Sequence, residues 1–135
     1  MSRTFRAHPS ALHEIRSFVR DLSESQGLPG PAIDDIVLAA SEAAANAIVH
    51  TNSSSVEIRW RQSGDAIEVQ IMDRGVFRRR VAMPEFDGHG RGIPLMTALV
   101  DELFIKEGTP RRPGTIVRLV KLMEPQAGGP SARAV

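Results

Sequence analysis

The 135-residue chain has the length of a single domain that can bury a sizeable core. Its 17 basic and 16 acidic residues leave a formal net charge of +1, so bulk charge gives no argument for nucleic-acid binding. The absence of cysteine excludes a thiol nucleophile and a cysteine metal site. No apolar run approaches the roughly 18 residues of a membrane span, and the first ten residues form no hydrophobic signal core, so we expect a cytoplasmic protein.

The first fifty residues predict a short strand followed by two helices. The strand covers residues 2–7, where the pattern is weak. Pro9 and Ser10 then supply helix-start chemistry, with the proline in the first turn and Ser10 as the expected cap of a helix over residues 10–26. Gly27 is a natural stop for that helix, and a short break leads into a second helix over residues 32–50.

The second helix has two faces of different character. At about 100° per residue, one broad arc is apolar and contains Ile33, Ile36, Val37, Ala40, Ala43, Ala44, Ala47 and Ile48. The opposite arc contains Asp35, Glu42, Asn46 and His50, the last three at successive i, i+4 steps. This polar arc is either a solvated surface or, since alanines surround it and no Lys or Arg lies nearby, a smooth surface that another group covers. In the second case, a carboxylate and a carboxamide one turn apart can hold a cation or orient a nucleophile.

Beyond residue 50 the spacing of the apolar residues changes from the helical period to a period of two residues, which is typical of strands. Apolar and charged residues alternate over residues 56–61 and 67–71 around a Ser63-Gly64-Asp65 turn, which predicts an antiparallel hairpin. In the remaining segments we expect a loop over residues 78–87, a helix over residues 93–100, and two strands over residues 103–107 and 115–122.

Element order predicts the fold class. The sequence strand-helix-helix-strand-strand-helix-strand-strand implies an α+β protein, a two-layer sandwich in which helices cover one face of a mainly antiparallel sheet. We expect one domain over residues 1–123. Residues 124–135 are rich in Gly and Pro and nearly devoid of large apolar residues, which predicts a disordered tail.

Asp73-Arg74-Gly75-Val76-Phe77 follows an apolar strand. A buried carboxylate at a strand end can accept a hydrogen bond from an exocyclic amine such as that of adenine. Gly75 would let a ligand approach the backbone closely. The alternative is an ordinary Asx turn that closes the strand.

Gly88-His89-Gly90-Arg91-Gly92 stands immediately before a predicted helix. Closely spaced glycines expose backbone N–H groups, and a helix N-terminus adds a dipole that favours phosphate. The segment is not a Walker A loop, because no Gly-Lys-Ser/Thr follows, and no βαβ unit surrounds it as in a Rossmann fingerprint. Gly114-Thr115 opens the last strand, where a hydroxyl can reach a ligand; the alternative for Gly114 is a plain turn glycine.

The four motifs are more specific together than singly. They occur in the order Glu42-x-x-x-Asn46, Asp73-x-Gly75-x-Phe77, Gly88-x-Gly90-x-Gly92 and Gly114-Thr115. This combination resembles the GHKL ATPase superfamily with its Bergerat fold, and within it the small anti-sigma-factor serine kinases of bacterial partner-switching systems. The resemblance covers residues 10–121. Its assignment to the small branch rests on size and on the short connection between the second and third motifs.

The resemblance implies an ATP and magnesium site. Asn46 would coordinate a Mg²⁺ ion that bridges the nucleotide phosphates, and Glu42 would act as base towards the attacking hydroxyl or orient a water. Asp73 would bind the adenine amine, with Gly75 allowing the base to sit against the strand end, and Thr115 would help fix Asp73 or the adenine.

Gly88, Gly90 and Gly92 would wrap the phosphates. The sequence departs from the family pattern at two places. Arg78-Arg79-Arg80 follows Phe77, where a Pro- or Gly-rich continuation is common, and Ile93 stands where leucine is usual.

The function implied by the resemblance is that of a protein serine kinase. Such a protein sequesters a sigma factor and phosphorylates a serine of a STAS-type anti-anti-sigma antagonist, with no direct contact to nucleic acid or membrane. It would act as a homodimer, with residues 2–7 and the helix over 10–26 as the candidate shared surface. The alternative is an ATP-binding interaction module of the same pathway without kinase activity. Glu42 favours turnover, because a pure binding site needs no base.

Overall fold

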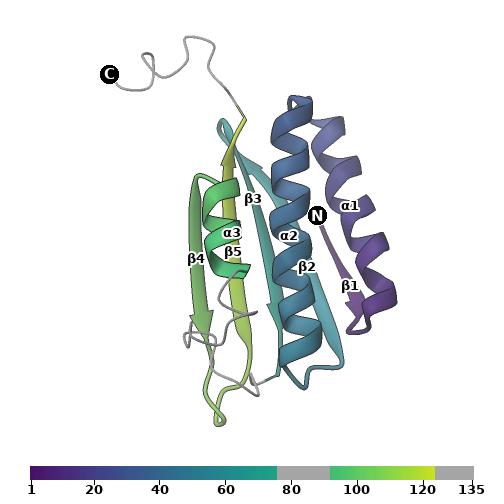
Figure 1. The fold of residues 1–135 in the computed structure, drawn as a ribbon, viewed down its shortest axis with the longest axis vertical. Helices are drawn as coiled ribbons and strands as arrows, with labels where there is room; N and C mark the ends of the chain where they lie inside the picture. The colour runs from purple at the N-terminus through teal and green to yellow at the C-terminus, as the bar shows by residue number, and fades with distance from the viewer. Residues whose placement is uncertain (76–91, 124–135) are drawn as a thin grey trace.

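The computed structural model describes residues 1–75 and 92–123. Within these ranges it contains one five-stranded sheet, formed by β1 (Ser2–Arg6), β2 (Ser55–Ser63), β3 (Ala66–Asp73), β4 (Glu102–Glu107) and β5 (Thr115–Leu122). Its helices are the short 3-10 turn η1 (Pro9–Ala11), α1 (Leu12–Ser25), α2 (Gly30–His50) and α3 (Gly92–Leu99). The α-helices lie side by side on one face of the sheet (Figure 1). The predicted α+β class, with helices layered on one sheet face, is therefore confirmed.

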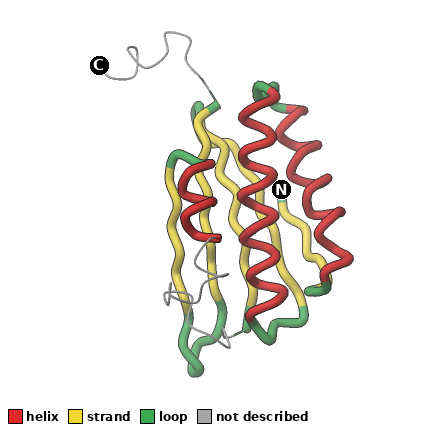
Figure 2. The backbone as a smooth tube through the Cα atoms, in the orientation of Figure 1, coloured by secondary structure: helices red, strands yellow, loops and turns green. Residues whose placement is uncertain are grey.

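The strand order places the two predicted ligand-facing strand ends side by side. The order is β1-β2-β3-β5-β4, and every neighbouring pair is antiparallel (Figure 2). In the β3–β5 register, Asp73 at the end of β3 pairs with Thr115 at the start of β5. Two motifs 42 positions apart in the sequence thus meet at one end of the sheet.

The core lies between the sheet and the helices. The inward residues of the predicted hairpin are all buried: Val56, Ile58, Trp60, Ile67, Val69 and Ile71. They pack with the buried apolar residues of α1 and α2. The ring nitrogen of Trp60 donates a hydrogen bond to the buried hydroxyl of Ser23, 3.3 Å away, which satisfies both polar groups inside the core.

The start of the first helix differs from the prediction. Ser10 does not cap α1; it lies in η1, and the Nδ1 atom of His8 accepts a hydrogen bond from the backbone N–H of Ser10 at 3.1 Å. The histidine ring therefore takes the capping role that sequence preference assigns to serine. Gly27, at φ +80°, ends the turn after α1 as expected. The second helix begins at Gly30, two residues earlier than predicted.

The polar arc of α2 matches neither of its two interpretations, a fully solvated surface or a surface that another group covers. The apolar arc is buried as predicted, with Ile48 half-buried. The large side chains that face solvent are Leu38 and Val49, which are 45% and 54% exposed. The four polar residues, Asp35, Glu42, Asn46 and His50, are all half-buried. The polar arc therefore lies at the side of the helix, between its buried face and its solvent face. Asn46 in this arc lies close to α3.

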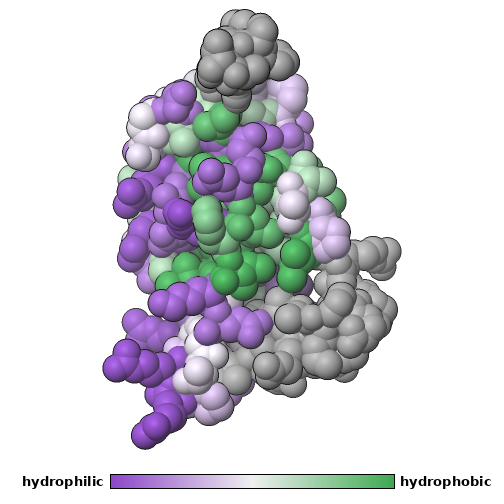
Figure 3. Space-filling model, turned by 90° about the vertical axis from the view of Figure 1, so that its left-hand side faces the viewer, coloured by the Kyte–Doolittle hydropathy of each residue, from purple (hydrophilic) through white to green (hydrophobic). Residues whose placement is uncertain are grey.

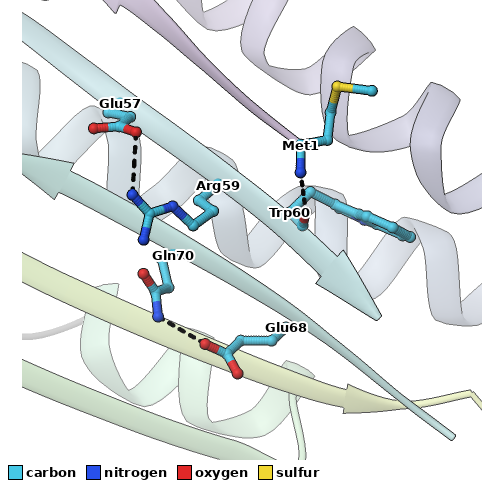
Figure 4. Close-up of polar contacts among 6 residues, drawn as sticks. All are labelled: Met1, Glu57, Arg59, Trp60, Glu68 and Gln70. Atoms are coloured by element: carbon cyan, nitrogen blue, oxygen red, sulfur yellow. Dashed lines mark hydrogen bonds and ion pairs between the residues drawn. The ribbon is translucent and has the colours of Figure 1, made fainter. Parts of the chain in front are cut away.

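The outer sheet face is polar along β2 and β3. A close-up shows Glu57 paired with Arg59 at 3.5 Å, and the amide of Gln70 donating to Glu68 at 2.7 Å, on the side away from the helices (Figure 4). Seen from the β4 edge, apolar side chains gather over α3 and β4 (Figure 3). Phe104 of β4 is 47% exposed.

Several expectations fall outside the part of the chain that the structure describes. These are the loop over residues 78–87 and the tail over residues 124–135. Within the described residues, no helix combines the length and the apolar character needed to cross a membrane.

Candidate functional site

Three of the predicted site residues line one cavity between the helix layer and the sheet. Asn46 reaches it from α2, Asp73 from the end of β3 and Thr115 from the start of β5. The other walls are apolar and come from five elements, α2, β3, α3, β4 and β5: Ala43, Ala47, Ile71, Ile93, Met96, Ile105 and Val117. The cavity thus combines a carboxylate, a carboxamide and a hydroxyl with apolar walls, the usual composition of a small-molecule site.

Asp73 is a buried carboxylate whose ionisation is unfavourable. Its side chain is 7% exposed. Burial raises the pKa of Asp73 from 3.8 to about 6, although hydrogen bonds from the backbone of Gly75 and Thr115 act in the opposite direction. The Asx-turn alternative is also present, since Oδ1 of Asp73 accepts the backbone N–H of Gly75 at 2.9 Å. An Asx turn does not require its carboxylate to be buried, so the turn alone does not explain why Asp73 lies at the cavity.

Gly75 is required by close packing between two loops. A Cβ atom at this position would lie 2.5 Å from the backbone nitrogen of Ser53 and 2.6 Å from Oδ1 of Asn52. Ser53 also accepts the backbone N–H of Arg74 through its hydroxyl at 3.2 Å. The segment after α2 is therefore fixed against the end of β3, which sets the position of α2 relative to Asp73.

The end of α2 is anchored by a buried threonine that sequence analysis did not identify. The hydroxyl of Thr51 donates to the carbonyl of Ala47 at 2.7 Å and accepts the backbone N–H of Ser53 at 3.1 Å. Thr51 is 3% exposed. A β-branched polar residue just after a helix is a weak sequence signal, because such residues are also common in exposed loops.

Gly114 is more than a plain turn glycine. It adopts φ +130°, where side-chain-bearing residues are strained, and a Cβ atom there would lie 3.0 Å from the carbonyl oxygen of Asp73. Its N–H donates to the carbonyl of Gly75 at 2.9 Å. Gly108, which sequence analysis missed, has the same tight packing at the other side of this loop, since its Cβ would clash with backbone of Arg112 and Gly114.

Glu42 and Asn46 lie one helical turn apart on the same side of α2, as the spacing predicted. Both are half-buried. Asn46 lines the cavity, whereas Glu42 does not. Within residues 1–75 and 92–123, no group of three His, Asp or Glu side chains forms a metal site.

The glycine motif is described only at its last member. Gly92 begins α3, in agreement with the predicted helix start. Gly88, Gly90 and the arginines at positions 78–80 lie outside the described residues. Ile93, where the family pattern has leucine, is half-buried and lines the cavity.

A lysine that sequence analysis left unassigned holds α3 in place. The ammonium of Lys121 on β5 donates to the carbonyl of Leu99 at the end of α3, 2.8 Å away. It also pairs with the carboxylate of Asp35 on α2 at 3.2 Å. This cation therefore ties three elements together and satisfies a C-terminal carbonyl of the short helix. No sequence signal marks it, because Asp35 and Lys121 are 86 positions apart.

The chemistry of the lining suits a flat heteroaromatic ring that carries an amine. The carboxylate of Asp73 would accept from the amine, and the apolar walls would contact the ring faces. The cavity measures about 20 Å³, which is the space of about one water molecule. A ring of purine size therefore requires the walls of this cavity to move apart.

Comparison with known proteins identifies the fold. The chain is similar to the solved structure of the RsbU and RsbW domains of Rv1364c from Mycobacterium tuberculosis, with 22% identity, a TM-score of 0.71, and coverage of 91% of this chain and 32% of that one. It is also similar to the blue-light activated histidine kinase EL346 of Erythrobacter litoralis, with 22% identity, a TM-score of 0.62, and coverage of 88% and 42%. The chain thus spans less than half of either structure. No curated protein matched the sequence.

A family model identifies more than the fold. The model described as histidine kinase-like ATPase domain matches residues 5–121. This range contains the cavity, the end of β3 and the start of β5. Because the match extends over most of the chain, the chain belongs to the histidine kinase-like ATPase domain family.

Proposed function

We propose that this chain is an ATP-dependent protein serine kinase of a bacterial partner-switching pathway. It would sequester a sigma factor and phosphorylate a serine of a STAS-type anti-anti-sigma antagonist. Membership of the ATPase family supports ATP as the ligand. The likeness to a structure that contains an RsbW domain supports the choice of branch. In this proposal the protein acts as a homodimer in the cytoplasm and contacts neither nucleic acid nor membrane directly.

The observation that carries the proposal is the cavity that Asn46 and Asp73 line together, with Glu42 one helical turn from Asn46 on α2. Asp73 offers a buried acceptor for the adenine amine. Asn46 lines the same cavity with a carboxamide oxygen, a hard ligand of the kind that Mg²⁺ binds. Magnesium commonly takes one or two protein ligands together with substrate phosphates, so one carboxamide fits this ion without an acidic cluster. The ion would neutralise phosphate charge.

Glu42 would then act as the general base. It would take the proton of the attacking serine hydroxyl while the serine oxygen bonds to the γ-phosphorus. The bond between that phosphorus and the β–γ bridging oxygen would break, leaving ADP and phosphoserine. Phosphoryl transfer needs mainly positioning and charge neutralisation, so the protein requires little beyond this set and the phosphate-binding glycines.

The competing function is an ATP-binding module that transfers no phosphate. Glu42→Gln separates the two, because glutamine keeps the shape and reach of the side chain without accepting the proton. We expect near-normal stabilisation by ATP and Mg²⁺, about 2.7 kcal/mol at a hundredfold excess over Kd. Phosphate transfer to STAS-type antagonists should fall by about 10²–10⁴-fold, and a fall of about tenfold would still support the role of base.

Glu102→Gln is the matched control, since Glu102 is exposed at the start of β4 and does not line the cavity. It should leave both measurements unchanged. A wild-type protein that binds ATP but phosphorylates no antagonist would favour the binding module. A melting temperature that millimolar ATP and Mg²⁺ leave unchanged would contradict the ATP site itself.

A further inference from the structure

The outer face of the sheet carries a hollow, separate from the cavity that Asn46 lines, which borders two of the motifs through Asp73, Arg74 and Gly114. It has a volume of about 710 Å³ and lies beside the loop that joins β4 to β5. The α-helices lie on the opposite face (Figure 1). Ligand sites usually measure roughly 300–1,000 Å³, so the hollow has the size of a binding site.

The floor of the hollow is apolar. Met72 on β3 and Ile116 on β5 are directly paired across the strands, and both line it. Ile116, the second residue of β5, is 40% exposed, a large share for an isoleucine. The same row continues through Glu57 to Thr4 on one side and to Lys106 on the other, so the apolar part of the floor is its centre. Burial of this floor by a partner would remove apolar surface from water.

The rim of the hollow is cationic. Arg74, Lys106 and Arg112 line it, and none of them forms an ion pair with a residue in the described part of the chain. Of the carboxylates that line the hollow, Glu57 is paired with Arg59 (Figure 4), and the side chain of Asp73 is buried on the helix side of the sheet. Glu107 remains, so the three cations outnumber the unpaired acids.

The width of the hollow favours an extended chain over a single small anion. Its lining reaches from β1 to β4, which are four strand spacings apart. At about 4.8 Å per spacing this is roughly 19 Å, the length of about six residues of extended peptide. Apolar anchors held in a pocket and surrounded by polar contacts are the usual arrangement of a protein interface.

We propose that this hollow docks an acidic segment of a partner protein, with an apolar side chain on Met72 and Ile116 and carboxylates at Arg74, Lys106 and Arg112. The inference does not depend on the kinase proposal. The two sites lie back to back, because Asp73 lines both the hollow and the cavity.

The test uses a fluorescein-labelled octapeptide with Leu-Phe at its centre and three acidic residues on each side. We expect saturable binding in fluorescence anisotropy, and amide shifts of the ¹⁵N-labelled protein centred on the floor and rim. A peptide with lysine in place of the acidic residues should fail to bind. Arg112→Glu should weaken binding at least tenfold, and Ile116→Ser should also weaken it.

Arg111→Glu is the matched control. Arg111 is exposed beside Arg112 in the same loop but does not line the hollow, so its reversal should change the affinity less than threefold. Both variants alter exposed side chains, and unchanged melting temperatures will verify folding. If Arg111→Glu and Arg112→Glu weakened peptide binding equally, the effect would be a general electrostatic attraction and not a contact in the hollow. This result would overturn the proposal. The absence of saturable binding at millimolar peptide would also overturn the proposal. So would amide shifts of the free protein that depend on its concentration and lie at the floor and rim of the hollow, because they would assign this surface to self-association.

Discussion

Burial of Asp73 predicts that its replacement by asparagine stabilises the folded protein near neutral pH. The pKa of Asp73 rises from 3.8 to about 6 on folding, chiefly because burial disfavours the charged form. A difference of about two pKa units corresponds to about 3 kcal/mol, at 1.36 kcal/mol per unit. Asparagine has nearly the same shape and can still accept the N–H of Gly75, so Asp73→Asn should relieve up to about this amount.

The pH dependence gives the sign of the effect. Between pH 4 and 6 the folded protein holds a proton on Asp73 that the unfolded chain has already released. The free energy of unfolding that this group contributes therefore decreases as pH rises through this window, and is constant above it. The advantage of Asp73→Asn over wild type should be absent near pH 3.5 and should grow to about 3 kcal/mol by pH 7.

Urea denaturation followed by Trp60 fluorescence measures this directly, since Trp60 is the single tryptophan and is 5% exposed. Asp65→Asn is the control, because Asp65 is exposed in the turn between β2 and β3. A gap between Asp73→Asn and wild type that stays constant from pH 4 to 7, or widens towards acid, would refute the burial argument. The same variant should lose most stabilisation by ATP and Mg²⁺, so stability and ligand binding should change in opposite directions.

Two further substitutions test the elements that position the cavity. Lys121→Met removes the charged hydrogen bonds to Leu99 and Asp35, so the free energy of unfolding measured in urea should fall by about 1–3 kcal/mol. The control is Lys106→Met, which should have little effect because Lys106 is exposed and has no such contacts within the described residues. Gly75→Ala should lower the free energy of unfolding by about 1–3 kcal/mol, because the Cβ atom would meet backbone of the segment after α2. A melting temperature equal to wild type in either variant would contradict the role assigned to that residue.

The parts of the fold that sequence predicts are those set by local periodicity. Alternation along residues 56–71 identified the hairpin and its buried side, because successive residues of a strand face opposite ways whatever the strand packs against. The apolar arc of α2 followed from helical spacing for the same reason. Asp73 and Thr115 were predicted to share one site from their motifs, and the β3–β5 register places them opposite each other.

Contacts between distant segments could not be predicted in this way. A helical wheel gives the direction of Glu42 and Asn46 but not what packs beside them, so the sideways position of the polar arc needed the structure. The bonds of Lys121 join residues that only the fold brings together. Gly75 was assigned a role towards a ligand, whereas the structure adds a steric reason within the protein itself. The ligand roles of these residues stay predictions.

The same pKa connects ligand binding to protons. Below about pH 6, Asp73 in the free protein is protonated, and the neutral acid accepts a hydrogen bond from an adenine amine less strongly than the carboxylate does. ATP affinity should therefore fall below pH 6, by at most about tenfold for each pH unit if one proton is released on binding, and level off above it.

Isothermal titration from pH 5 to 8 measures this affinity. Two buffers of different ionisation enthalpy will count the protons released at pH 5.5. The competing acceptor is the carboxamide of Asn46 in the same cavity, which does not titrate in this range. A constant affinity across the range, with no proton release, would assign the amine to such a neutral acceptor rather than to Asp73. A proton released at pH 5.5 but not at pH 8 when adenosine, which lacks the titrating terminal phosphate, is the ligand would instead identify the buried carboxylate as the group that the ligand binds.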